Sequence, residues 1–144
     1  MIVLDTTVLV YAVGTEHPLR APCRGLIELA RDGVVRLTTT VEVIQEFAHV
    51  RSRRRPRQDV ADIARVYAIG LAPLVSPAAE ELLDGLWLFA RSPGLGPFDA
   101  VLAATAQRRG WTLASADRTF AGVEGLSLLD PASASFLSEA RETG

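Results

Sequence analysis

Acidic residues fall at the ends of apolar segments in this sequence, where carboxylates from distant parts of the chain can meet. Asp5 follows the apolar residues 2–4, and Asp117 comes shortly after residues 111–114. Asp99 lies at the start of a helical pattern. Each of these acids alone could simply cap a helix or complement its dipole. Together they indicate a carboxylate cluster, because the first two are expected at one edge of a sheet and the third at a helix start beside it.

A fourth acid, Glu46, lies within an amphipathic helical pattern. The apolar members of this pattern recur at helical spacing: Val43, Ile44, Phe47 and Val50. Glu46 is therefore expected to border the buried face of the helix rather than to point fully into solvent. Clustered carboxylates repel one another, and a cation among them relieves this repulsion. Hard oxygen ligands suit Mg²⁺ or Mn²⁺, which can activate water and stabilise a phosphoryl transition state.

Composition excludes several other kinds of site. The chain has one cysteine, Cys23, and two isolated histidines, His17 and His49, so neither a disulfide framework nor a cysteine-rich zinc site is expected. All 15 basic residues are arginine, which excludes the catalytic lysine of Schiff-base enzymes and the lysine of a P-loop. The net charge of −2 gives no general signature of nucleic-acid binding.

Length and hydropathy indicate one globular domain over residues 1–144, with 49% hydrophobic residues. No apolar run reaches the roughly 18 residues of a membrane span, and the first residues lack the basic region of a signal peptide. We therefore expect a cytoplasmic protein with no membrane segment.

Short β-branched or apolar runs alternate with longer amphipathic stretches. The runs predict strands at residues 2–4, 34–38, 71–75, 111–114 and 126–129. The stretches predict helices at residues 6–13, 19–32, 40–50, 58–69, 78–90, 97–109 and 131–140. This alternation predicts an α/β fold of three layers (α/β/α) with a central parallel sheet. Ligands of such sheets bind beyond the carboxyl ends of the strands, where the acids are expected.

Four segments of the sequence resemble the PIN-domain family, and specifically the VapC-type toxin ribonucleases of toxin–antitoxin systems. They are Ile2-Val-Leu-Asp-Thr-Thr, Thr40-Val-Glu-Val-Ile-Gln-Glu-Phe, Pro97-Phe-Asp-Ala-Val-Leu-Ala-Ala-Thr-Ala and Leu113-Ala-Ser-Ala-Asp-Arg-Thr-Phe. Any one of these segments is a weak signal. All four occur in the order that the family has, and they span nearly the whole chain.

The resemblance implies a metal-dependent endoribonuclease that hydrolyses RNA phosphodiester bonds with Mg²⁺, for which Mn²⁺ can substitute. It also implies that four acids hold the metal and act as the catalytic residues: Asp5, Glu46, Asp99 and Asp117. It also places hydroxyls near the metal at Thr6 and Ser115, although both could equally act as local caps. A cognate antitoxin is the implied protein partner.

Glu42 competes with Glu46 for the helical position in this set, because it lies one turn earlier on nearly the same face. In the family pattern the acid follows a Ser or Thr by six positions and precedes an apolar residue. Glu46 fits this pattern with Thr40 before it and Phe47 after it, so Glu46 is the predicted ligand.

Two further segments have alternative interpretations. The run Arg51-Ser-Arg-Arg-Arg-Pro-Arg contains Arg51, Arg53, Arg54, Arg55 and Arg57. These arginines could form a solvated surface at a helix end, or they could contact RNA phosphates. The predicted helix at 78–90 is apolar on more than one face, which indicates either core packing or a contact with a second copy or an antitoxin. We expect a homodimer.

Two other classes of protein compete with the nuclease. A phospho-acceptor signalling domain also gathers aspartates above a parallel sheet, but it is expected to need a lysine, which this chain lacks. A catalytically silent PIN-like module that binds RNA or protein remains the alternative. The complete set of four acids favours the enzyme.

Overall fold

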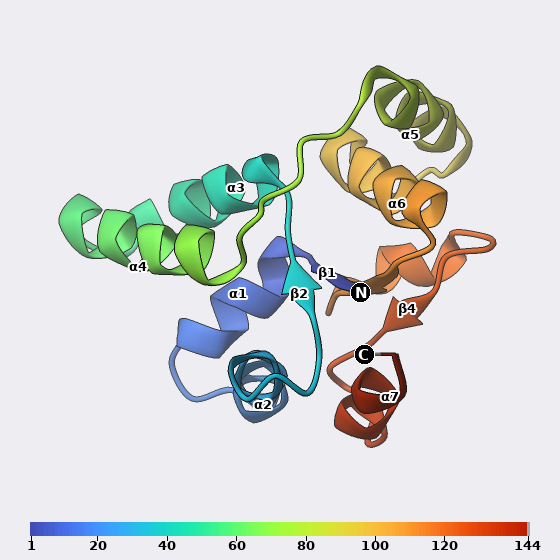
Figure 1. Ribbon diagram of the computed structural model, residues 1–144. Coiled ribbons are helices and arrows are strands. Elements are labelled where there is room, and N and C mark those ends of the chain that lie inside the picture. The colour runs from blue at the N-terminus through green and yellow to red at the C-terminus, as the bar shows by residue number, and fades with distance from the viewer. Residues whose placement is uncertain (144) are drawn as a thin grey trace.

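A computed structural model describes residues 1–143 as a four-stranded parallel sheet with helices around it (Figure 1). The elements follow in the order β1 (Ile2–Leu4), α1 (Thr6–Val13), α2 (Arg20–Arg31), β2 (Leu37–Thr38), α3 (Val41–Ser52), α4 (Arg57–Gly70), α5 (Ala79–Arg91), α6 (Pro97–Arg109), β3 (Thr112–Ala114), the 3₁₀ helix η1 (Arg118–Gly122), β4 (Leu128–Leu129) and α7 (Phe136–Thr143). Within this part of the chain, no helix is long and apolar enough to cross a membrane.

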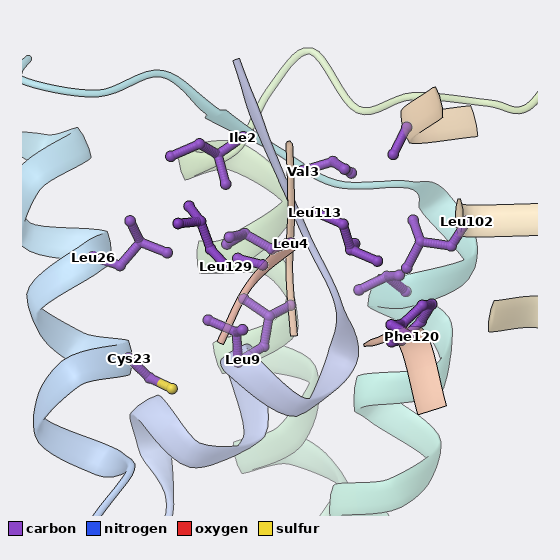
Figure 2. Close-up of a cluster of buried hydrophobic side chains, with 14 of the residues drawn as sticks. Ile2, Val3, Leu4, Leu9, Cys23, Leu26, Leu102, Leu113, Phe120 and Leu129 are labelled. Carbon is purple, nitrogen blue, oxygen red and sulfur yellow. The ribbon is translucent and has the colours of Figure 1, made fainter. Parts of the chain in front are cut away.

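The strands lie in the order β2-β1-β3-β4, and every pair is parallel. All residues of β1 and β3 are buried, as expected for short strands covered on both faces. Figure 2 shows Cys23 and Leu26 of α2 approaching the strands from one side, and Leu102 and Phe120 from the other. The prediction of a three-layer fold with a central parallel sheet is confirmed.

Capping signals in the sequence set the starts and ends of the helices near the carboxyl edge of the sheet. The side chain of Thr40 accepts a hydrogen bond from the Val43 amide at 3.2 Å and so begins α3. Pro97 occupies the first turn of α6, where its missing N–H costs nothing. Gly110 ends α6 in the left-handed conformation with φ of 63°. These predicted boundaries are confirmed.

Four predicted elements differ from the structure. The strands predicted at 34–38 and 126–129 are reduced to β2 and β4, and the helix predicted at 131–140 begins only at Phe136. The strand predicted at 71–75 is wrong, because only Val75 forms an isolated bridge, with Thr40. Leu71 instead ends α4 by donating its amide to Tyr67, and the proline at 73 has no amide to contribute to a ladder.

Helix α5 lies on α6, beyond the sheet (Figure 1). The two helices approach closely at Gly85, where an added Cβ would lie 2.6 Å from the Val101 Cα. Arg109 of α6 also donates to the buried carboxylate of Glu81, with Nε 2.6 Å from Oε1. The outer face of α5 is exposed and apolar, so the core-packing interpretation is wrong for Leu82, Leu83, Leu86, Trp87 and Phe89. The predicted contact with a partner remains the other interpretation of this face.

Candidate active site

The four predicted acids meet at the carboxyl edge of the sheet. Asp5 follows β1, Asp117 follows β3, Asp99 lies in the first turn of α6, and Glu46 projects from α3. All four line one depression of about 250 Å³. The structure therefore brings together every residue of the predicted quartet, which we call the acidic site.

Asp5 is the most deeply buried member of the acidic site, with 3% of its surface exposed. Its Oδ2 accepts hydrogen bonds from the Thr7 hydroxyl at 2.6 Å, the Ser115 hydroxyl at 2.7 Å and the Thr7 amide at 3.3 Å. Burial raises the pKa of Asp5, and these donors act in the opposite direction by favouring the ionised form. The same hydrogen bonds hold the orientation of the carboxylate.

Glu46 reaches the acidic site from the surface of α3. It borders the buried side chains of Val43 and Phe47, as expected, yet it remains exposed to solvent. The Thr6 hydroxyl donates to Glu46 Oε2 at 2.6 Å, which links the start of α1 to the middle of α3. Of the two competing glutamates, Glu46 is the one that lines the depression shared with Asp117.

Asp99 carries the clearest electrostatic sign of crowding. Its pKa is raised to about 6, first by burial and then by the negative charges of Asp5, Glu46 and Asp117. The backbone of Gly96 opposes this rise only in part. The other three acids are therefore close enough to Asp99 to disfavour its ionised form near neutral pH.

Ser115 joins the two aspartates that follow the strands. Its hydroxyl donates to Asp5 and accepts a hydrogen bond from the Asp117 amide at 2.9 Å. Asp117 Oδ1 accepts from the amide and the hydroxyl of Thr119, both at 2.8 Å, and so caps η1. The Thr6 and Ser115 hydroxyls thus each donate to a carboxylate of the acidic site, and their predicted place beside a metal stays a prediction.

Thr7 is a member of the site that the sequence interpretation missed. Its hydroxyl donates to Asp5, accepts from the Ala116 amide at 3.0 Å and lies 3.3 Å from the Ser115 hydroxyl. The sequence signal for this role was the second threonine after Asp5, because a residue two positions after an N-cap can return its hydroxyl to the cap.

The donor set suits a hard divalent cation, since four carboxylates and nearby hydroxyls offer only oxygen ligands. Among residues 1–143, however, no three His, Cys, Asp or Glu side chains form a ready-made metal-binding group. Water molecules would have to complete the coordination, as is usual for Mg²⁺. The repulsion that raises the pKa of Asp99 is the feature of the site that a cation would relieve.

The predicted arginine run continues from the wall of the acidic site. Val50 lines the depression, and the run begins at the next residue, Arg51. The residues at 53–55 and Arg57 are exposed, and Arg51 is partly buried. Both interpretations of the run, as a solvated surface or as a phosphate-binding surface, agree with this exposure.

Residues 2–126 match the family model described as "PIN domain". The chain therefore belongs to the PIN-domain family. Its relatives within this family include named ribonucleases. The chain is 51% identical over 140 residues to "Ribonuclease VapC7" of Mycobacterium tuberculosis, and the match covers 96% of this chain and 97% of that protein. It is also 37% identical over 114 residues to "Ribonuclease VapC23" of the same species, covering 78% of this chain and 88% of that protein.

Solved structures support the same fold. One is VapBC2 from Rickettsia felis bound to a DNA fragment from their promoter, which matches with a TM-score of 0.70 and 18% identity over 90% of this chain and 98% of the other. Another is FitAcB from Neisseria gonorrhoeae, with a TM-score of 0.63 and 18% identity over 91% of this chain and 98% of the other. Both sequence identities are low, so these two likenesses concern the fold alone.

Proposed function

We propose that the protein is a metal-dependent endoribonuclease and the toxin of a toxin–antitoxin pair. The observation that carries this proposal is the acidic site: four carboxylates line one depression at the carboxyl edge of the sheet, and burial together with the charges of the other three raises the pKa of Asp99. The 51% identity to a protein named a ribonuclease supports RNA as the substrate. The neighbours of known structure that contain toxin–antitoxin pairs support an antitoxin as the protein partner.

Four residues would hold the divalent cation, some of them through water: Asp5, Glu46, Asp99 and Asp117. We propose Mg²⁺, for which Mn²⁺ can substitute; when bound it activates water and offsets negative charge on the phosphoryl oxygens. Thr7 and Ser115 hold the Asp5 carboxylate toward the depression, and Thr6 holds Glu46. This positioning matters because catalysis of phosphodiester hydrolysis depends on preorganised charge.

Three features outside the acidic site complete the proposal. The arginine run contacts RNA phosphates through Arg51, Arg53, Arg54, Arg55 and Arg57. The exposed apolar face of α5 forms the contact of a homodimer, since apolar patches of this kind mark protein interfaces. The protein acts in the cytoplasm.

The test is cleavage of a mixed RNA pool by purified protein with Mg²⁺, with Mn²⁺ and with excess EDTA. We expect cleavage with either metal and none with EDTA. The Asp99→Asn protein is prepared in parallel and should cleave far more slowly, and a mock purification from cells without the protein controls for contaminating nucleases. A silent PIN-like module would bind RNA in these assays without cutting it, and equal cleavage by the wild-type and Asp99→Asn proteins would reject the proposed site.

A further inference from the structure

A second depression opens beside the acidic site, between α3 and α6. It has a volume of about 320 Å³ and shares three acids with the acidic site: Asp5, Glu46 and Asp99. Its remaining wall includes Val43 and Leu102, which are buried and apolar. A volume near 300 Å³ is at the lower end of the range for small-molecule pockets. An RNA whose phosphate lies at the acidic site would therefore have an adjoining pocket for one base.

Phe98 stands at the rim of this second depression. It precedes Asp99 in the first turn of α6, lines the depression and keeps 71% of its surface exposed. The Phe98 ring does not pack in the hydrophobic core, so its large apolar surface is left exposed to solvent. An exposed aromatic face beside a phosphate site is the usual platform on which a nucleic-acid base stacks.

Glu42 supplies a hydrogen-bond acceptor in the same depression. Its Oε2 is buried, and no side chain or backbone group in residues 1–143 donates a hydrogen bond to it. The charge of Glu42 suits the first turn of α3, but the helix dipole does not satisfy this oxygen. A buried carboxylate oxygen without a donor is costly, so a turn of the Glu42 side chain that brings this oxygen to the N–H group of a ligand in the depression would be favoured.

We infer that this depression, which we call the base pocket, binds a guanine next to the scissile phosphate. Phe98 stacks on the base and Glu42 accepts hydrogen bonds from its Watson–Crick edge. Guanine presents two adjacent donors there, N1–H and the 2-amino group, whereas uracil presents a single N–H between two carbonyl oxygens that a carboxylate repels. The inference rests on the proposed function, since it concerns the same RNA substrate.

The first arm of the test maps cleavage sites in RNA of random sequence. Wild-type protein is expected to cut next to guanine, with uracil least frequent at that position. The variants Phe98→Leu and Glu42→Gln should reduce the guanine-to-uracil ratio, by about 5-fold or more for Glu42→Gln. Two exposed residues away from both depressions provide matched controls: Ile69→Ala on α4 and Glu28→Gln on α2 should keep the wild-type ratio.

The second arm measures binding in the slowly cleaving Asp99→Asn background by fluorescence anisotropy. The probes are a labelled uridine decamer and the same decamer with one central guanine. The guanine probe should bind more tightly, and adding Phe98→Ala should weaken its binding about 5- to 150-fold, the range of base–aromatic stacking. Far-UV circular dichroism of each variant checks that it is folded.

The outcomes separate the two proposals. Cleavage without any base preference, or a preference that Phe98→Leu and Glu42→Gln leave intact, would overturn the base pocket while the nuclease stands. Absence of cleavage by wild-type protein, together with guanine-dependent binding through Phe98 and Glu42, would overturn the nuclease and keep the pocket. Equal binding of both probes in all variants would overturn the pocket, and the depression would then be free for a protein partner.

Discussion

Replacing Asp99 with asparagine should stabilise the metal-free protein while it impairs catalysis. Asparagine keeps the shape of the side chain and removes one of four crowded negative charges. In the folded protein the pKa of Asp99 is raised from 3.8 to about 6, chiefly by burial and then by the other three acids. The folded state therefore holds the proton of Asp99 more tightly than the unfolded chain does, and ionisation of this group opposes folding.

The pKa values of Asp99 in the unfolded and folded states give the sign and the size of the change in stability. The stability associated with protonated Asp99 is fully present below about pH 4 and is lost as the pH rises to about 6. At about 1.4 kcal/mol for each pH unit between the two values, the loss is at most about 3 kcal/mol. Asp99 is only partly buried, so solvent screening reduces it to about 1–2 kcal/mol. This corresponds to about 3–8 °C in Tm for a chain of this size.

Thermal melting in EDTA between pH 4 and pH 8 measures the effect. The Asp99→Asn protein should melt higher than wild type above pH 6, and the two curves should converge toward pH 4. With Mg²⁺ the order should reverse, because a cation that binds only the folded state stabilises it by about 2.7 kcal/mol at a hundred times its Kd. In the cleavage assay Asp99→Asn should lose about 10²- to 10³-fold in rate.

Two results would refute this reasoning. A lower Tm of Asp99→Asn in EDTA at pH 7.5 would mean that the charge of Asp99 does not oppose folding. An equal rise in Tm with Mg²⁺ in both proteins would mean that the metal binds elsewhere, and the acidic site would not be the metal site. The variant Asp62→Asn, at an exposed position on α4, controls for the general effect of removing one acid.

Four further predictions test the surroundings of the acidic site. Glu46→Gln should lower the cleavage rate of every RNA, whereas Glu42→Gln should lower it mainly for guanine-containing sites; the reverse pattern would assign the metal to Glu42. Thr7→Val should slow cleavage and shrink the rise in Tm with Mg²⁺, because Asp5 loses a short hydrogen bond, and unchanged metal titrations would contradict this. Alanine at positions 53–55 should flatten the salt dependence of RNA binding without changing Tm. Gly85→Ala should cost about 1–3 kcal/mol in urea unfolding, since its methyl group meets the Val101 backbone, and full stability would show that α5 can shift freely.

The sequence was sufficient to predict where the acids meet, because the prediction needed only the order of elements. Asp5 and Asp117 each follow a strand, and parallel strands place such residues at one edge. Asp99 was predicted from its place after Pro97, which marks the start of a helix. Each of these signals lies within a short stretch of sequence, and the parallel sheet brings the acids together at one edge.

Features that depend on packing between distant segments were not predictable in this way. The apolar residues of α5 have a composition that suits a core helix, yet Leu83 is 58% exposed and Trp87 is 64% exposed because α5 packs mainly on α6 and leaves its outer face open. The strand predicted at 71–75 failed for a similar reason, since a strand needs a neighbour and only Val75 has one. The base pocket likewise depends on the approach of α3 to α6, which no local pattern encodes.

The hydrogen bonds within the acidic site suggest why its four acids have unequal roles. Asp5 is almost fully buried, which raises its pKa, and three hydrogen bonds from Thr7 and Ser115 oppose this rise and hold the carboxylate in place. No side chain among residues 1–143 donates a hydrogen bond to Asp99, and its pKa is raised first by burial and then by the acids that would share a cation with it. A cation entering the site would relieve the repulsion at Asp99, while Asp5 provides a carboxylate that is already oriented. On this argument, Thr7→Val should weaken metal binding by loosening the Asp5 carboxylate, whereas Asp99→Asn should weaken it by removing a charge and should also change its dependence on pH.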